Sequence, residues 1–178
     1  MQALSAALEG DPSTVVRSNG AVLIRRFTPD VSTRLFNALG NQSDAPLTLD
    51  LRGCPGGDAE AALALAGEFL PQGTPLARLC DAADPDAVEL VVARFAQAYT
   101  MPLTILVDRA TASAAELFTA ILQATGRATV HGEHTAGKDS AQRLVRDAAG
   151  IRYATAARFE LPDGTSLAKG VTPDHFRR

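Results

Sequence analysis

The sequence predicts an α/β fold built on a mainly parallel sheet. Short apolar stretches alternate with helix-like segments along the 178 residues, and such alternation is typical of parallel sheets whose crossovers are helices. Turns rich in glycine and proline separate the segments. The apolar fraction of 46% is normal for a globular protein. The length favours one domain of ordinary size with a real core.

The strand predictions rest on apolar runs bounded by turn residues. In PLTLDLR (46–52), Leu47, Leu49 and Leu51 fall on one face. PLTILVD (102–108) reads as a buried strand. We also predict strands at 21–27, 75–80 and 127–132, one long strand or a hairpin at 150–164, and loops at 81–86 and 133–142. The segment 87–99 fits a strand or a helix.

Apolar spacing predicts helices over 29–40, 58–70 and 113–126. In the first, Val31, Leu35 and Leu39 recur every four residues. The third starts with Ser113, and Glu116 follows three residues later, which is the pattern of a capping box. From this stretch alone, Ser113 reads as a helix cap.

Composition excludes several classes. The net charge of −3 gives no sign of a nucleic-acid-binding surface. No apolar run reaches the roughly 18 residues of a membrane span, and the N-terminal stretch MQALSAALEGDPS lacks the features of a signal peptide. Cys54 and Cys80 form neither a disulfide framework nor a C-x-x-C metal motif.

Sites in parallel sheets form in loops beyond the carboxyl ends of strands. The loops after Leu51, Val107 and Val130 are therefore the ones to inspect: RGCPGG (52–57), RATASA (109–114) and EHTAGKDSAQ (133–142). The first offers backbone N–H groups at a Gly-Gly turn, without the spacing of a phosphate loop or a dinucleotide fingerprint. The second offers a hydroxyl at a helix N-terminus, an arrangement suited to acyl transfer.

A serine nucleophile needs a base. None of the histidines at 131, 134 and 175 has flanks that stand out. Lys138 could serve if burial disfavours its charged form, since Ser-Lys is a known variant of the triad. Viewed alone, Lys138 reads as a solvated surface residue.

Three spaced motifs resemble one family. LTLDLRGCPGG, VDRATASAAELFTAILQATGRATVHGEHTAGKDSAQ and LPDGTSLAKGVTPD together resemble the carboxy-terminal processing (tail-specific) proteases, the S41 serine peptidases. The match runs in order from about Ala21 to Asp174. It implies a fold of the Clp-protease/crotonase type, in which ββα units stack.

The resemblance also implies a catalytic set. Mapped by motif, Ser113 is the nucleophile, Lys138 the general base, and Gln142 the group that orients the lysine. The implied reaction is cleavage of polypeptides, near their C-termini, without a metal or cofactor.

The same mapping gives an oxyanion hole. Its donors are the amides of Gly57 and Ala114, with Gly56 allowing the backbone to approach.

The chain departs from the family pattern at four positions: Cys54 for asparagine, Ala115 for a serine, Ala136 for an aromatic residue and Asp139 for glycine. A carboxylate at 139 would favour the charged form of Lys138 and weaken it as a base. Family members usually also carry a PDZ module before the core, which binds a substrate C-terminus by strand addition. We expect residues 1–20 to be a remnant of that module and 21–178 to be the catalytic core.

Two other functions stay open. One is a non-catalytic ligand-binding or scaffold protein, as in the retinoid-binding relatives of this fold. The other is an acyl-CoA enzyme of the crotonase type, which would not need the Ser/Lys/Gln set. A homo-oligomer is compatible with the sequence, and the compartment stays open, although family relatives are often periplasmic or secreted.

Overall fold

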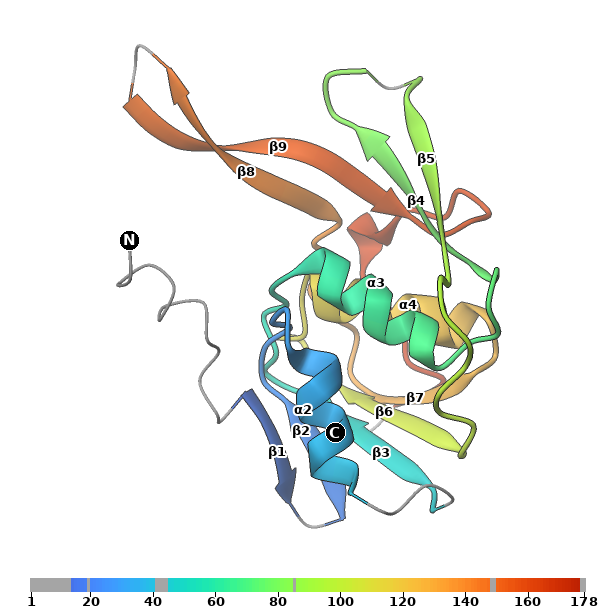
Figure 1. Cartoon of the computed structure of the whole chain (residues 1–178). Coiled ribbons are helices and arrows are strands. Elements are labelled where there is room, and N and C mark those ends of the chain that lie inside the picture. Colours follow the sequence, from blue (N-terminus) through green and yellow to red (C-terminus); the bar gives the residue numbers. More distant parts are fainter. Residues whose placement is uncertain (1–13, 19, 41–44, 85, 148–149, 177–178) are drawn as a thin grey trace.

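The main sheet has six strands, of which all but the first run parallel to their neighbours (Figure 1). This computed structural model describes residues 14–18, 20–40, 45–84, 86–147 and 150–176. Across the sheet the order is β1 (Val15–Ser18), β2 (Ala21–Ile24), β3 (Leu47–Asp50), β6 (Leu103–Val107), β7 (Ala128–Gly132) and β10 (His175–Phe176). The predicted α/β class with a mainly parallel sheet is confirmed.

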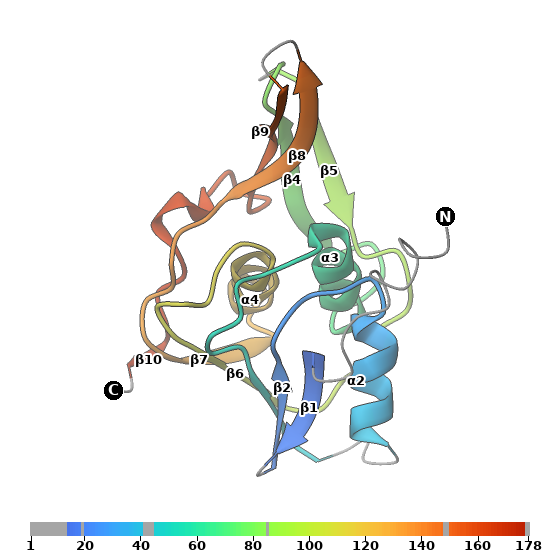
Figure 2. The ribbon, with the colours of Figure 1, turned by 90° about the vertical axis from the view of Figure 1, so that its left-hand side faces the viewer.

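Helices α2 (Val31–Leu39), α3 (Ala59–Glu68) and α4 (Ala114–Ala124) lie on one face of this sheet (Figure 2). The four-residue spacing predicted for α2 is confirmed, because its buried side chains are Val31, Leu35 and Leu39. Asp58 begins α3 by accepting hydrogen bonds from two amides of the first turn. Helix α4 is buried along most of its length, and every residue from Ala114 to Leu122 is buried.

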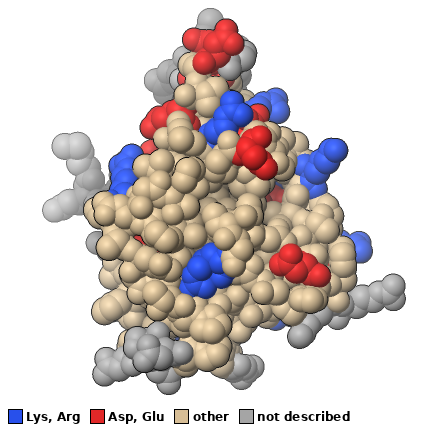
Figure 3. Space-filling view, turned by 90° about the vertical axis from the view of Figure 1, so that its right-hand side faces the viewer, with Lys and Arg blue, Asp and Glu red and all other residues tan. Residues whose placement is uncertain are grey.

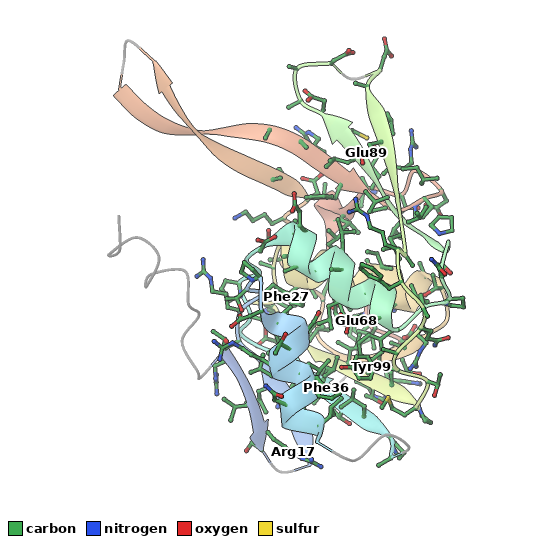
Figure 4. All side chains as sticks on the ribbon, viewed as in Figure 1. Arg17, Phe27, Phe36, Glu68, Glu89 and Tyr99 are labelled. Carbon is green, nitrogen blue, oxygen red and sulfur yellow. The ribbon has the colours of Figure 1, made fainter. Side chains whose placement is uncertain are left out.

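Aromatic rings pack against one another in the core. The rings of Phe27 and Phe118 lie 5.4 Å apart, and those of Phe69 and Tyr99 lie 4.8 Å apart. Offset and tilted pairs of this kind add to the stability that burial gives. Figure 4 labels Phe27 near the start of α3 and Tyr99 near its end, so the cluster runs the length of the helix layer.

A second sheet lies above the helices and is antiparallel throughout (Figure 1). Its order is β5 (Val88–Val92), β4 (Pro75–Asp81), β9 (Gly150–Glu160) and β8 (Ser140–Asp147). The inner face carries Leu79, Val91 and Phe159, which pack against the core. Strands β8 and β9 form a long hairpin that extends beyond the body of the molecule.

The second sheet resolves two sequence predictions and corrects one. The ambiguous segment 87–99 contains a strand and no helix. The segment 150–164 is one long strand followed by a turn at Pro162 and Asp163. The loop predicted at 133–142 is too long, because pairing with β9 makes a strand from Ser140 onward.

The face of the main sheet away from the helices is only half-buried. Along β2, β3 and β6, fully buried residues alternate with partly exposed ones. A hollow of about 380 Å³ on the open face is lined by residues that include Leu23, Asp50, Arg52 and Leu106. There Arg52 donates to Asp50 at 2.6 and 2.9 Å.

Charged side chains are dispersed over the face seen in Figure 3, where acidic and basic groups alternate without a continuous basic stripe. Among the described helices, none is long and apolar enough to cross a membrane. The division at residue 20 stays a prediction: residues 1–13 lie outside the described part, and β1 pairs with β2.

Candidate active site

The Gly-Gly turn after β3 is fastened to the loop after β6. Asp108 Oδ1 accepts hydrogen bonds of 3.0 Å from the amides of Gly53 and Thr111. Thr111 Oγ1 donates to the carbonyl of Leu51 at 2.9 Å, and the Ala112 amide donates to the carbonyl of Cys54 at 3.0 Å. Apart from the bond between Asp108 and Thr111, these bonds join segments that are more than fifty residues apart in sequence.

The third loop joins the other two. The Ala136 amide donates to the carbonyl of Thr111 at 3.0 Å. Gly137 has a φ of +80°, and a Cβ there would lie 2.6 Å from the carbonyl oxygen of Ala168. The loop is thus held between the loop after β6 and the segment around Ala168. The loops after β3, β6 and β7, which the sequence singles out, therefore meet in the structure.

Glu116 ties the second and third loops together from below. This carboxylate has no solvent exposure. Its Oε2 atom accepts hydrogen bonds of 2.8 Å from the backbone amides of both Ser113 and Lys138. Its Oε1 atom accepts from Gly137 N at 2.6 Å and from Thr135 Oγ1 at 2.5 Å. A single oxygen therefore holds the backbones of Ser113 and Lys138 side by side.

Ser113 has an uncommon backbone conformation. Its φ of 57° makes it the one non-glycine residue with positive φ in the described part of the chain. An ordinary N-cap residue has an extended backbone, whereas Ser113 has ψ −122°. A side chain in this region is held there by the surrounding structure at a cost of about 1–3 kcal/mol. Ser113 precedes α4, as predicted, but in a conformation that a simple cap does not need.

The Gly-Gly turn approaches Ser113 closely. A Cβ at Gly56 would lie 2.8 Å from both Ser113 Cβ and Ala114 N. The Phe27 amide donates to the carbonyl of Gly56, and the Asp58 amide donates to the carbonyl of Phe27. Between these two bonds, the amide of Gly57 has no acceptor within the described residues, and neither has the amide of Ala114. Two backbone donors beside Ser113 are therefore available to a ligand.

The side chain of Lys138 is exposed, and no ion pair joins it to Asp139 in the described part of the chain. Asp139 instead faces Arg158: its Oδ2 atom lies 3.8 Å from Arg158 Nη1 and accepts a hydrogen bond from Ser166 Oγ at 3.4 Å. The backbone of Gln142 lies in β8 opposite Thr155, and its side chain is outside the described set.

Cys54 lies under the Gly-Gly turn with no exposure. Burial raises the pKa of its thiol to about 11, so the thiol is neutral at physiological pH. Its Sγ is 4.0 Å from the carbonyl oxygen of Gly56. In place of the amide expected from the family pattern, this chain has a small apolar filler.

The sequence does not single out two structurally central carboxylates. It marks Glu116 only as part of a cap and Asp108 only as the end of a strand. Their contacts with loops 19 to 55 residues away have no sequence signal. Within the described residues, no group of three or more His, Cys, Asp or Glu side chains could hold a metal ion.

Fold and site together define an α/β protein with a serine at a helix N-terminus and two available amides beside it. The model of peptidase family S41 matches residues 18–176, and the chain belongs to this family. A protein of Staphylococcus aureus named "Probable CtpA-like serine protease" is 33% identical over 161 residues. The aligned region covers 87% of this chain and 32% of that protein. The chain thus spans about a third of the length of the curated relatives it matches.

Two solved structures are similar to this chain. The photosystem II D1 C-terminal processing protease superposes with a TM-score of 0.74 at 27% identity, over 93% of this chain and 45% of that one. Mature CPAF superposes with a TM-score of 0.68 at 15% identity, over 87% of this chain and 46% of that one. The second likeness shows the fold alone.

Proposed function

We propose that this chain is the catalytic core of a serine endopeptidase that cleaves polypeptides near their C-termini. Ser113 is the nucleophile, Lys138 the general base, and Gln142 orients the lysine. The amides of Gly57 and Ala114, with Gly56 allowing the approach, form the oxyanion hole. The C-terminal preference is carried over from the D1 C-terminal processing protease, whose name states that it processes a C-terminus.

One observation carries the proposal. Two backbone N–H groups without a protein acceptor flank a serine in a glycine-like conformation. Backbone donors without an acceptor beside a nucleophile are what a developing oxyanion requires. The Glu116 carboxylate supports this reading, because it fixes the backbone of Ser113 and of Lys138 from the same oxygen.

The reaction follows from these parts. Lys138 Nζ takes the proton of Ser113 Oγ as this oxygen attacks the substrate carbonyl. The tetrahedral oxyanion accepts hydrogen bonds from Gly57 and Ala114. Lys138 then gives its proton to the leaving amine, and an acyl-enzyme remains on Ser113. Water attacks the ester in the second half, with the lysine again as base, and releases the acid and the free serine.

Lys138 is exposed in the structure, and a neutral amine needs protection from water. In the proposed enzyme, bound substrate covers the lysine and supplies this protection. The same exposure favours a second candidate, a non-catalytic binding protein on this fold. In that case the serine would be unreactive.

Labelling separates the two candidates. A small serine-directed phosphonate should modify Ser113 stoichiometrically, and Ser113→Ala should take no label. Absence of label on the native protein would favour the binding protein.

Lys138→Ala tests the base assignment. It should lower peptide turnover by about 100-fold or more, whereas Lys169→Ala, which removes another exposed lysine, should have no effect. Retained turnover in Lys138→Ala would contradict the assignment.

A further inference from the structure

Strand β8 is an end strand of the second sheet. One of its edges pairs with β9, and within the described residues its other edge pairs with no strand. The strand begins at Ser140, two residues after Lys138. An unpaired edge offers a row of backbone donors and acceptors to any extended chain that comes alongside.

The backbone of Ser140 points toward the free edge. The Phe159 amide donates to the carbonyl of Asp139 at 2.9 Å, so these two residues form a hydrogen-bonded pair. Hydrogen-bonded and non-hydrogen-bonded residue pairs alternate along an antiparallel ladder. The next pair is Ser140 with Arg158, which is therefore a non-hydrogen-bonded pair. The N–H and C=O of Ser140 are therefore directed away from β9.

The free edge lies over the candidate site. In Figure 1, β8 forms the lower side of the hairpin, facing the N-terminal end of α3. The residues just before β8 are those that Glu116 fastens to the start of α4. An extended chain paired with β8 would consequently pass close to Ser113.

We propose that the polypeptide substrate binds as an added strand along the outer edge of β8, with the N–H and C=O of Ser140 as the contacts nearest the scissile bond. This proposal rests on the proposed peptidase function. Recognition through backbone groups tolerates many substrate sequences but requires an extended segment. A second copy of the chain could use the same edge. The substrate is favoured because the edge begins beside Lys138.

A proline exchange tests the edge directly. Ser140→Pro removes the outward N–H but no bond to β9. With fluorescein-labelled casein as an unstructured probe, kcat/KM should fall by about tenfold or more, mainly through KM. Labelling of Ser113 by the small phosphonate should be unchanged.

The matched control is Leu90→Pro on β5, the opposite edge of the same sheet. The Asp81 amide donates to the Ala87 carbonyl, so the alternation directs the Leu90 N–H outward as well. This control should cleave casein like native protein. Cleavage by Ser140→Pro at the native rate would overturn the proposal.

Amide hydrogen exchange covers the case in which Ser140→Pro does not fold. In Ser113→Ala protein, saturating casein should slow exchange at Ser140 by at least about tenfold and leave Leu90 unchanged. Unchanged exchange at Ser140 would overturn the proposal, as would protection that depends on protein concentration without casein. If native protein is not labelled by the phosphonate and does not cleave casein, the proposed function fails. Amide exchange in the Ser113→Ala protein still reports whether casein binds along β8.

Discussion

Replacing Glu116 with glutamine tests the hydrogen-bond hub under the site. The carboxylate accepts four hydrogen bonds, two at each oxygen, and is fully buried. Glutamine keeps the shape but exchanges one acceptor oxygen for an NH2 donor. The amide can orient its oxygen toward only one of the two pairs of donors.

The less damaging orientation follows from the donors. An NH2 in the place of Oε2 would face the amides of Ser113 and Lys138, neither of which can accept. An NH2 in the place of Oε1 would face one amide, Gly137, and the hydroxyl of Thr135. The second orientation leaves the Gly137 amide without a partner, and the bonds that remain are no longer charge-assisted. The expected loss of unfolding free energy is about 3–5 kcal/mol.

Urea denaturation followed by circular dichroism measures this loss. Glu133→Gln is the control, because Glu133 is partly exposed and its ion pair with Arg109 has a distance of 3.6 Å. That variant should lose no more than about 1 kcal/mol. Phosphonate labelling of the Glu116→Gln variant should also fall, since the backbones of Ser113 and Lys138 lose their common anchor. A stability within about 1 kcal/mol of native protein would refute the reasoning.

Three further variants or reagents test the surroundings. Gly56→Ala should abolish labelling of Ser113, because its Cβ would lie 2.8 Å from Ala114 N, whereas Gly73→Ala, with nothing within 4 Å, should label normally. Iodoacetamide at pH 8 should leave Cys54 unmodified in folded protein, because burial raises its pKa to about 11, and mass spectrometry should find alkylation at Cys54 only after unfolding. Burial also raises the pKa of Glu68, which lies with Tyr99 on the side shown in Figure 4. The charged form of Glu68 is therefore disfavoured in the folded protein. The Glu68 carboxyl contributes most to stability at pH values below its unfolded pKa, and this contribution is lost as pH rises through its folded pKa. Glu68→Gln should raise the melting temperature at pH 7 relative to native protein and change it less at pH 4; an equal change at both values would contradict this.

The elements of the main sheet could be predicted because their burial pattern is local. Leu47 and Leu49 alternate with partly exposed residues, as the period of a strand requires. Strand β8 of the second sheet could not be predicted in the same way. Ser140 and Ala141 have little strand propensity of their own, and they become a strand only through pairing with β9.

Some residues of the candidate site also have local sequence signals, and the surroundings of others depend on tertiary structure. Its glycines and the serine could be located because turns and helix starts have compositional signals. The environment of Lys138 could not, since exposure depends on what the surrounding loops cover. Glu116 could be placed at the third position of the helix, but its bond to Thr135 depends on tertiary structure.

The conformation of Ser113 has a consequence for engineering this chain. Glycine adopts a φ of 57° without penalty, so a chain with no side chain at 113 would be the more heat-resistant one. Screening random variants for thermal tolerance alone would tend to discard the hydroxyl early. A screen for robust versions of this protein therefore has to score Ser113 reactivity in the same round.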